Sequence, residues 1–298
     1  MTICPACYSK KLEEIWRGFA RKGAIGDYAS SNTLAFSCKK CASIISKQTN
    51  MYSEESFKTG EYRKSVDGSK FSNPQYFFYK HFEDTIRYLS LIPKKNLINK
   101  KVLDFGSGAG SLLNIMSPFI KLGVGIELDK NFHYKKNNIS NVSDLLESDK
   151  ICKKFDLITS YSTFGQLFNT EQTLNNLVKR LKKNGILIIG DVNAQDYLLT
   201  NGIKKYKDEV FFRQNYQNYF SEKGLKNIAK RNNLTFLSSK FIQRYEYENI
   251  SSYLSKKKLN QIFNKSLKKI EIKNYIKSNF ENNKISDYMV ITFQKKDA

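Results

Sequence analysis

The sequence has few of several residue types that would narrow its function at once. It contains two His, one Trp, four Pro and five Cys among 298 residues. It also lacks any apolar run near the ~18 residues that a membrane-spanning helix needs. The first residues have no basic region followed by an apolar one, so we expect no secretory signal. These absences predict no membrane span and favour a cytoplasmic location, where thiols stay reduced.

Arginine is scarce as well, although the chain is strongly basic. The formal net charge is +22, yet only eight of the 50 basic residues are Arg. A basic chain often binds nucleic acid or an anionic membrane surface, but Arg is the residue that pairs bidentately with phosphates and bases. We therefore interpret the charge mainly as a solvated, lysine-rich surface and keep nucleic acid as the less favoured partner.

Four of the five cysteines stand in two Cys-x2-Cys pairs near the N-terminus. Cys4 and Cys7 form the first pair, and Cys38 and Cys41 form the second. Each pair can point two thiolates at one place, so the four predict a tetrahedral structural zinc site with no open position for water. Two disulfides are the alternative, which a reducing compartment disfavours. We expect residues 1–50 to form a small zinc-ribbon module.

Short apolar strands alternate with helical stretches from residue 101 onward. We expect strands over 102–105, 124–126, 157–160 and 186–189, and a helix over 173–181. Such alternation predicts a parallel sheet with helices on both faces. Two later alternating runs, 234–245 and 287–296, can finish the sheet in the antiparallel direction.

The segment between the cysteines and the first of these strands has two halves. Its first half is polar and rich in turn residues, as in a linker or lid. Its second half places Phe78, Phe82, Ile86 and Leu89 at helical spacing. The expected division of the chain is thus a ribbon over 1–50, a lid and helix over 51–100, and the main domain over 101–298.

The first expected strand runs into the stretch "DFGSGAG", which contains Asp104, Gly106, Gly108 and Gly110. Glycines directly after a strand usually mean that a ligand comes close to the backbone. The spacing differs from the G-x-G-x-x-G of dinucleotide sites, and no Lys follows as in a P-loop. The Asp104 carboxylate would repel a pyrophosphate and attract a cation. S-adenosylmethionine carries two cationic groups, an ammonium and a sulfonium.

A second acid, Glu127, ends the next expected strand in "GVGIELDK". An acid at this place can accept hydrogen bonds from both ribose hydroxyls of an adenosyl group, as in dinucleotide sites. Either acid alone is equally well explained as a helix cap or a solvated loop residue. Because Asp104 and Glu127 stand at successive strand ends, together they favour one shared site for S-adenosylmethionine.

These motifs resemble those of the class I S-adenosylmethionine-dependent methyltransferases. "DFGSGAG" is similar to the first motif of that family, "GIELD" to the second, and "FDLITSYSTFGQL" (155–167) to the fourth-strand motif. The stretch 177–193 resembles the family's helix, turn and fifth strand. The resemblance implies a Rossmann-like α/β fold whose sheet is mostly parallel with an antiparallel C-terminal strand. The implied cofactor contacts are Asp104, Gly106, Ser107, Gly108, Gly110, Glu127, Leu128, Asp144 and Ser160, where Asp144 is equally well read as a solvated loop acid.

The chain also resembles bacterial methyltransferases with an N-terminal zinc ribbon, many of which act on sugars or surface glycans. The similarity lies in the segments 61–69 and 211–234. Members of this group commonly have Glu-His after the fourth strand and in the second of these segments. This chain has Gly165-Gln166 and Asn215-Tyr216 there. Neither place therefore has a histidine that could act as a general base.

Tyr216, Gln166 and His81 remain as catalytic candidates. Methyl transfer is an in-line displacement, so alignment of the acceptor supplies much of the rate. A base is needed only for a weakly acidic hydroxyl or a carbon acid. Tyr216 can serve if nearby lysines lower the pKa of its phenol, although a Tyr in an aromatic-rich stretch is often packing. His81 lies on the helix that precedes the domain, which in this fold class can cover the cofactor.

We therefore expect methyl transfer from S-adenosylmethionine to a sugar-type small molecule, either a nucleotide-linked sugar or a surface-glycan precursor. Arg213 and Arg244 are candidates for binding a sugar diphosphate. An RNA methyltransferase is the first alternative, favoured by the ribbon and the charge, with the lysine run 256–258 as candidate phosphate contacts. A catalytically silent cofactor-binding or assembly protein is the second, favoured by the missing histidines. The sequence does not predict an oligomeric state.

Overall fold

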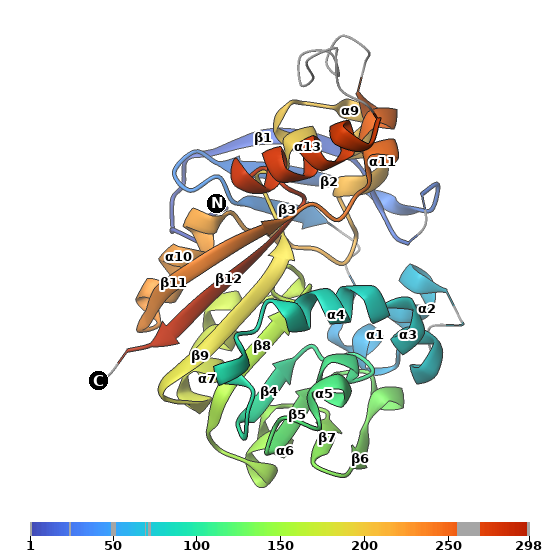
Figure 1. Cartoon of the computed structure of the whole chain (residues 1–298). Helices are drawn as coiled ribbons and strands as arrows, with labels where there is room; N and C mark the ends of the chain where they lie inside the picture. The colour runs from blue at the N-terminus through green and yellow to red at the C-terminus, as the bar shows by residue number, and fades with distance from the viewer. Residues whose placement is uncertain are drawn as a thin grey trace.

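A computed structural model of the chain describes residues 2–23, 25–48, 52–68, 70, 73–254 and 269–296. The lysine run 256–258 lies outside these residues. The described residues form two β-sheets, one of four strands and one of eight (Figure 1). No helix among them is both long enough and apolar enough to cross a bilayer.

The larger sheet has the strand order β11-β12-β9-β8-β4-β5-β7-β6. Its five central strands run parallel, whereas β11, β12 and β6 each run antiparallel to their neighbours. The bounds are β4 (Lys101–Phe105), β5 (Leu122–Ile126), β6 (Tyr134–Lys136), β7 (Ile139–Val142), β8 (Phe155–Tyr161), β9 (Leu181–Val192), β11 (Leu234–Ile242) and β12 (Tyr288–Lys295). The expected Rossmann-like sheet with antiparallel C-terminal strands is confirmed.

Both faces of this sheet are buried, which explains why its strands are apolar without interruption. Along β4, Val102 packs into one core cluster and Leu103 into the other. The helices that flank the sheet are α4 (Phe82–Ser90), α5 (Ser111–Met116), α6 (Leu145–Ile151), α7 (Thr170–Arg180) and α10 (Glu222–Arg231). Figure 1 shows α4 and α5 in front of the strands and α7 behind them.

The smaller sheet contains the N-terminal strands and one strand from far along the chain. Its order is β1-β2-β3-β10, all antiparallel, with bounds β1 (Leu12–Arg21), β2 (Tyr28–Cys38), β3 (Ile44–Gln48) and β10 (Asn218–Tyr219). Helices from the C-terminal half pack on it: α8 (Tyr197–Thr200), α9 (Lys204–Tyr206), α11 (Tyr247–Tyr253) and α13 (Lys269–Asn282). Figure 1 shows α9, α11 and α13 beside β1 and β2. Trp16 of β1 stacks on Phe212 with ring centroids 4.3 Å apart.

The chain between β10 and the π-helical turn Lys207–Phe211 is bound to this sheet through its backbone. Gln48 donates from Nε2 to the carbonyls of Arg213 and Tyr216 over 3.0 and 3.2 Å. The Arg21 N–H donates to the Phe212 carbonyl over 2.9 Å. The N-terminal sheet therefore holds the segment 212–219 in place.

Three short helices precede the main sheet, namely α1 (Glu54–Lys58), α2 (Glu61–Asp67) and α3 (Pro74–Lys80). The helix expected from the spacing of Phe78, Phe82, Ile86 and Leu89 is divided at His81, where α3 ends and α4 begins. Phe82 and Ile86 are exposed. Helix α4 is instead oriented by Tyr88, whose ring stacks on Tyr161 with centroids 4.1 Å apart.

Candidate active site

A cavity of about 950 Å³ lies at the carboxyl ends of the parallel strands. It is lined by the residues that follow β4, β5, β7 and β8, by the helices α1 to α4, and by the segment 213–216. Its volume is within the range of small-molecule sites. In open parallel sheets, ligands bind at this edge.

The three glycines after β4 all have left-handed backbone angles, with φ of +77° at Gly106, +54° at Gly108 and +69° at Gly110. A Cβ at Gly106 would lie 2.1 Å from Thr163 Oγ1, and one at Gly110 would lie 2.2 Å from the Tyr134 hydroxyl oxygen. A side chain at either position would clash, so the loop requires glycine. At these two positions the atoms closest to the loop belong to protein side chains, whereas the sequence predicted only a ligand close to the backbone.

Asp104 is buried and lines the cavity. Thr159 donates a hydrogen bond from Oγ1 to Asp104 Oδ1 over 2.7 Å. Burial raises the pKa of the carboxyl to about 7, with a smaller contribution from the negative charge of Glu127. A cationic ligand beside Asp104 would stabilise the ionised form.

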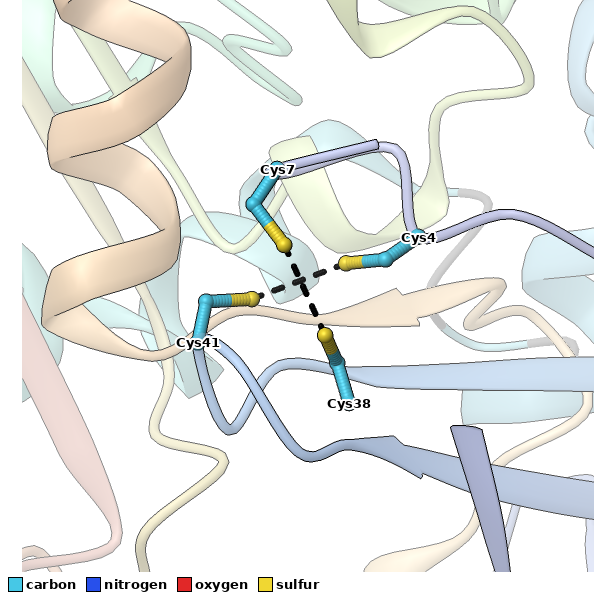
Figure 2. Close-up of side chains that lie close together, drawn as sticks. All are labelled: Cys4, Cys7, Cys38 and Cys41. Atoms are coloured by element: carbon cyan, nitrogen blue, oxygen red, sulfur yellow. Dashed lines mark hydrogen bonds between the residues drawn. The ribbon is translucent and has the colours of Figure 1, made fainter. Parts of the chain in front are cut away.

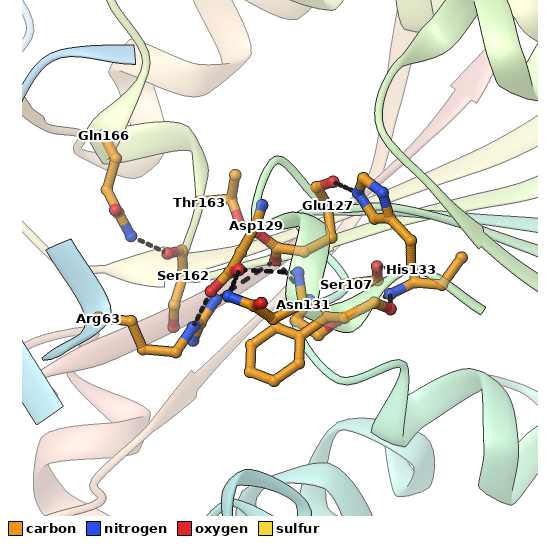
Figure 3. A network of polar contacts seen from close by, with 12 residues as sticks. Arg63, Ser107, Glu127, Asp129, Asn131, His133, Ser162, Thr163 and Gln166 are labelled. Atoms are coloured by element: carbon orange, nitrogen blue, oxygen red, sulfur yellow. Dashed lines mark hydrogen bonds and ion pairs between the residues drawn. The ribbon is translucent and has the colours of Figure 1, made fainter. Parts of the chain in front are cut away.

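Glu127 stands at the centre of a polar network shown in Figure 3. Its Oε2 accepts from the Gly108 N–H over 2.8 Å and lies 3.6 Å from Nη2 of Arg63. Its Oε1 accepts from the Asp129 N–H over 3.0 Å. Arg63 also pairs through Nε with Asp129 Oδ2 over 3.2 Å. The acid expected to bind ribose is thus fixed by the glycine loop on one side and by α2 on the other.

The Arg63 side chain is only 4% exposed. Its guanidinium carbon lies 4.5 Å from the ring centroid of Phe77 and 4.4 Å from that of Phe132. Sequence reasoning missed this residue. A single arginine in a polar, turn-rich segment looks solvated, and only the packing of the two rings shows that it is buried.

The other expected cofactor contacts lie in different surroundings. Ser107 and Leu128 line the cavity, and Ser107 donates to Asn141 Oδ1 over 2.5 Å. Asp144 lies at the cavity edge and caps α6, where its Oδ1 accepts from the N–H groups of Leu146 and Glu147. The hydrogen bond from Glu147 is the main cause that lowers the pKa of Asp144. Ser160 is buried, donates to the Phe105 carbonyl over 2.9 Å, and is not among the lining residues.

The three catalytic candidates all line the cavity. His81 packs against Phe77 with ring centroids 4.4 Å apart and ring planes inclined at 45°. Gln166 donates from Nε2 to the Ser162 carbonyl over 2.6 Å (Figure 3). Tyr216 donates to Asp191 over 3.1 Å.

The expectation that lysines lower the pKa of Tyr216 is wrong. Burial raises the pKa of this phenol well above its ordinary value, and the charge of Asp191 raises it further. The strongest cationic influences are the guanidinium groups of Arg213 and Arg244, which offset only part of the shift. Tyr216 therefore keeps its proton at neutral pH and acts as a hydrogen-bond donor.

The cavity wall also contains buried polar groups that sequence reasoning did not single out as site residues. Asn215 Oδ1 and the Tyr161 hydroxyl have no hydrogen-bond partner among the described residues. Asn215 is 6% exposed and Tyr161 is 9% exposed. Because a buried polar group without a partner is costly, both groups are suited to hydrogen bonds with a ligand.

The four N-terminal cysteines come together at one point (Figure 2). The Sγ atoms of Cys4 and Cys41 are 3.5 Å apart, as are those of Cys7 and Cys38. All four sulfurs lie within 4.8 Å of one another, and none forms a disulfide. Four sulfurs at ~2.3 Å from a tetrahedral zinc would be about 3.8 Å apart, so this set fits that ion. The hydrogen bond between the Cys4 and Cys41 sulfurs lowers the pKa of the Cys41 thiol.

The parallel sheet with a cavity at its carboxyl edge defines a Rossmann-like α/β protein. The sequence model of the methyltransferase-domain family matches residues 77–239, more than half of the 298 residues. The chain therefore belongs to this methyltransferase family.

Two curated relatives and one solved structure place the chain among similar proteins. Protein 235L of Invertebrate iridescent virus 6, provisionally named a methyltransferase, is 28% identical over 161 residues, which are 51% of this chain and 57% of that protein. A ubiquinone biosynthesis O-methyltransferase of Pelagibacter ubique is 30% identical over 158 residues, which are 47% of this chain and 64% of that protein. The chain thus spans less than two thirds of the length of these relatives.

The solved structure is a chain in the Haloferax volcanii complex of the Trm112 methyltransferase activator with a provisionally named methyltransferase. The match has a TM-score of 0.50 at 11% identity and covers 77% of this chain and 96% of that one. At this identity the likeness shows the fold alone.

Proposed function

We propose that the protein transfers the methyl group of S-adenosylmethionine to a small-molecule acceptor, specifically a nucleotide-linked sugar or a surface-glycan precursor. The observation that carries the cofactor assignment is the placement of Asp104, the glycine loop and Glu127 around one cavity in a chain of the methyltransferase family. Asp104 would hold a cationic group of the cofactor, and Glu127 would accept hydrogen bonds from its ribose. Ser107, Leu128, Asp144 and Ser160 remain proposed contacts, of which Ser160 has the least support because its hydroxyl is bonded to the Phe105 carbonyl.

The bound cofactor supplies a methyl group already activated by the sulfonium. The chain's own task is then to align the acceptor and to take up its proton. We propose His81 as the group that accepts this proton, because it lines the cavity and histidine is the side chain that most often serves as a general base. Gln166 and Tyr216 would position the acceptor, since both hold hydrogen bonds within the cavity wall.

The small-molecule acceptor is supported by relatives whose names assign them to ubiquinone biosynthesis. Its sugar-type character rests on the sequence resemblance and on the two unpartnered polar groups at Asn215 and Tyr161, which suit a hydroxylated molecule. We further propose that the four cysteines hold one structural zinc ion and that the protein acts in the cytoplasm. RNA as the acceptor is the alternative; its candidate lysines lie outside the described residues.

A screen with radiolabelled S-adenosylmethionine tests this proposal. The purified chain is offered sugar nucleotides and RNA as separate acceptor pools, with the Gly106→Arg variant as the inactive control. Label transfer to a sugar nucleotide by the unmodified chain alone supports the proposal. Transfer to RNA alone would favour the alternative. Binding of S-adenosylhomocysteine without transfer to any acceptor would indicate a catalytically silent cofactor-binding protein.

A further inference from the structure

Three arginines lie near one another where the cavity borders the N-terminal sheet. Arg213 and Arg244 both line the cavity, and Arg21 pairs with Arg213 through an isolated backbone bridge. Burial lowers the pKa of Arg21, and repulsion from Arg213 lowers it further. Arg213 and Arg244 also repel each other. Arg213 thus lies within electrostatic range of both other arginines.

The acidic groups around this cluster neutralise only part of its charge. Arg244 pairs with Asp287, from Nε to Oδ2 over 2.7 Å. Arg21 donates from Nη1 to the Gly23 carbonyl over 2.6 Å, and its buried Nε has no partner. The guanidinium of Arg213 forms no hydrogen bond or ion pair with any residue that the structure describes.

The remaining carboxylates nearby have other partners. Asp191 accepts from the N–H groups of Gly165 and Val192 and from Tyr216. Asp196 accepts from Tyr206 and from the Leu199 N–H. A half-buried cation without a counter-charge is unfavourable, so an anion at Arg213 would offset that cost.

A second, independent observation is that unpartnered polar groups line the same cavity as Arg213. Asn215 is two residues from Arg213, lines the same cavity and has an unpartnered, buried Oδ1. The buried Tyr161 hydroxyl likewise has no hydrogen-bond partner among the described residues. A guanidinium, an amide oxygen and a phenol hydroxyl together match a molecule with an anionic group and hydroxyl groups.

We propose that Arg213 forms an anion-binding subsite that takes a phosphate or diphosphate group of the acceptor, with Asn215 accepting a hydrogen bond from an acceptor hydroxyl. This inference rests on the proposed function, in which the cavity holds the acceptor together with the cofactor. The guanidinium fork matches phosphate oxygens in a bidentate arrangement. Arg244 remains paired with Asp287, and its positive charge contributes to the electrostatic potential of the subsite.

Isothermal titration calorimetry of the full chain, saturated with S-adenosylhomocysteine, tests the subsite with inorganic pyrophosphate as the probe. Arg213→Gln should weaken pyrophosphate binding by about ten- to a hundredfold, as expected for lost hydrogen bonds to a charged group. Arg17→Gln is the matched control, because Arg17 is 63% exposed and Glu14 is its ion-pair partner among the described residues. It removes the same charge and should leave pyrophosphate binding unchanged. Succinate in place of pyrophosphate distinguishes phosphate from carboxylate recognition, and tighter binding of succinate would overturn the phosphate assignment.

Equal pyrophosphate affinity in Arg213→Gln and the unmodified chain would overturn the subsite, as would an equal loss in Arg17→Gln. If Arg213→Gln does not fold, protection of Arg213 in the unmodified chain against phenylglyoxal decides instead. Pyrophosphate should slow modification of Arg213 and leave that of Arg17 unchanged; no protection of Arg213 would overturn the subsite.

The affinity for S-adenosylhomocysteine, measured on the same samples, separates this inference from the proposed function. If the chain does not bind S-adenosylhomocysteine but binds pyrophosphate in a way that depends on Arg213, the subsite is supported and the proposed function is overturned. If the chain binds S-adenosylhomocysteine but its pyrophosphate binding does not depend on Arg213, the subsite is overturned and the proposed function stands.

Discussion

The hydroxyl of Tyr216 donates a hydrogen bond to Asp191 Oδ1 over 3.1 Å, and both residues are buried. Asp191 stands near the end of β9 and also accepts from the N–H groups of Gly165 and Val192 over 2.7 and 2.8 Å. One carboxylate therefore joins β9, the turn that carries Gln166, and the segment held by the N-terminal sheet. Since the phenol of Tyr216 keeps its proton, the pair acts as a fixed donor and acceptor.

Tyr216→Phe should remove this hydrogen bond and leave the ring packing intact. We expect a loss of about 0.5–1.5 kcal/mol in the free energy of unfolding, measured by chemical denaturation, and a pH profile of turnover with unchanged inflections. Tyr79→Phe is the control, because Tyr79 is exposed and its substitution should have little effect. A neutral-pH inflection that disappears in Tyr216→Phe would show that Tyr216 is a base after all.

Asp104 should make stability and cofactor binding depend on pH in opposite directions. Burial raises the pKa of the folded-state carboxyl from 3.8 to about 7, so the folded state binds this proton more tightly than the unfolded state. Stability should therefore fall as pH rises through that window. A cationic ligand favours the ionised carboxylate, so affinity for S-adenosylhomocysteine should increase as pH rises through 7.

Asp104→Asn isolates this effect. In this variant, stability and cofactor affinity should both lose the part of their pH dependence that comes from the Asp104 carboxyl. The variant should also bind S-adenosylhomocysteine more weakly at alkaline pH. Calorimetry in buffers of different ionisation enthalpy measures the proton released on binding. Identical pH dependence of affinity in Asp104→Asn and the unmodified chain would disprove the assigned contact.

Gly106→Ala should abolish cofactor binding, because its Cβ would lie 2.1 Å from Thr163 Oγ1 in a backbone with a φ of +77°. Gly202→Ala separates crowding from backbone strain, since Gly202 has a φ of +69° and no atom within 4 Å of an added Cβ. It should cost only the strain of about 1 kcal/mol for an L-residue in this conformation. Equilibrium dialysis with labelled S-adenosylhomocysteine compares the two. Normal binding by Gly106→Ala would mean that the loop adapts.

The cysteine cluster should bind about one zinc ion per chain in protein purified without chelator, as four thiolates fill a tetrahedral site. Cys41→Ser should lower both the metal content and the midpoint of thermal unfolding. Cys152→Ser is the control, because Cys152 is buried outside the cluster and its loss should leave the zinc content unchanged. Metal analysis and calorimetric melting give the two readouts. Cysteines found oxidised in fresh protein would argue against a zinc site.

The parts of the site that the sequence predicts are those controlled by local pattern and by strand order. Asp104, the glycine loop and Glu127 follow expected strands directly, and parallel strands bring their carboxyl ends to one edge. The two Cys-x2-Cys pairs converge for the same kind of reason, since each is a short turn with fixed geometry. Ser160, by contrast, lies on a strand, where alternate side chains point to opposite faces, and its hydroxyl bonds to the neighbouring strand at Phe105.

Features that depend on packing between distant segments could not be predicted. Arg63 pairs with Glu127 and Asp129 only because α2 lies against the end of β5. The pKa of Tyr216 depends on burial beside Asp191, and a sequence shows the nearby lysines but not their distance. Strand β10 has two residues, too few to give an alternating pattern.

The pairing of β10 with β3 constrains how the chain can fold while it is being synthesised. Strands β1 to β3 leave the ribosome early, yet the strand that covers the free edge of β3 ends at Tyr219. More than half of the chain is made while the backbone N–H and C=O groups of that edge have no strand partner. An open edge of this kind can pair with another chain. A nascent chain released before residue 219 would therefore expose a sheet edge that can pair with other chains, and the N-terminal sheet is completed only when β10 has been synthesised.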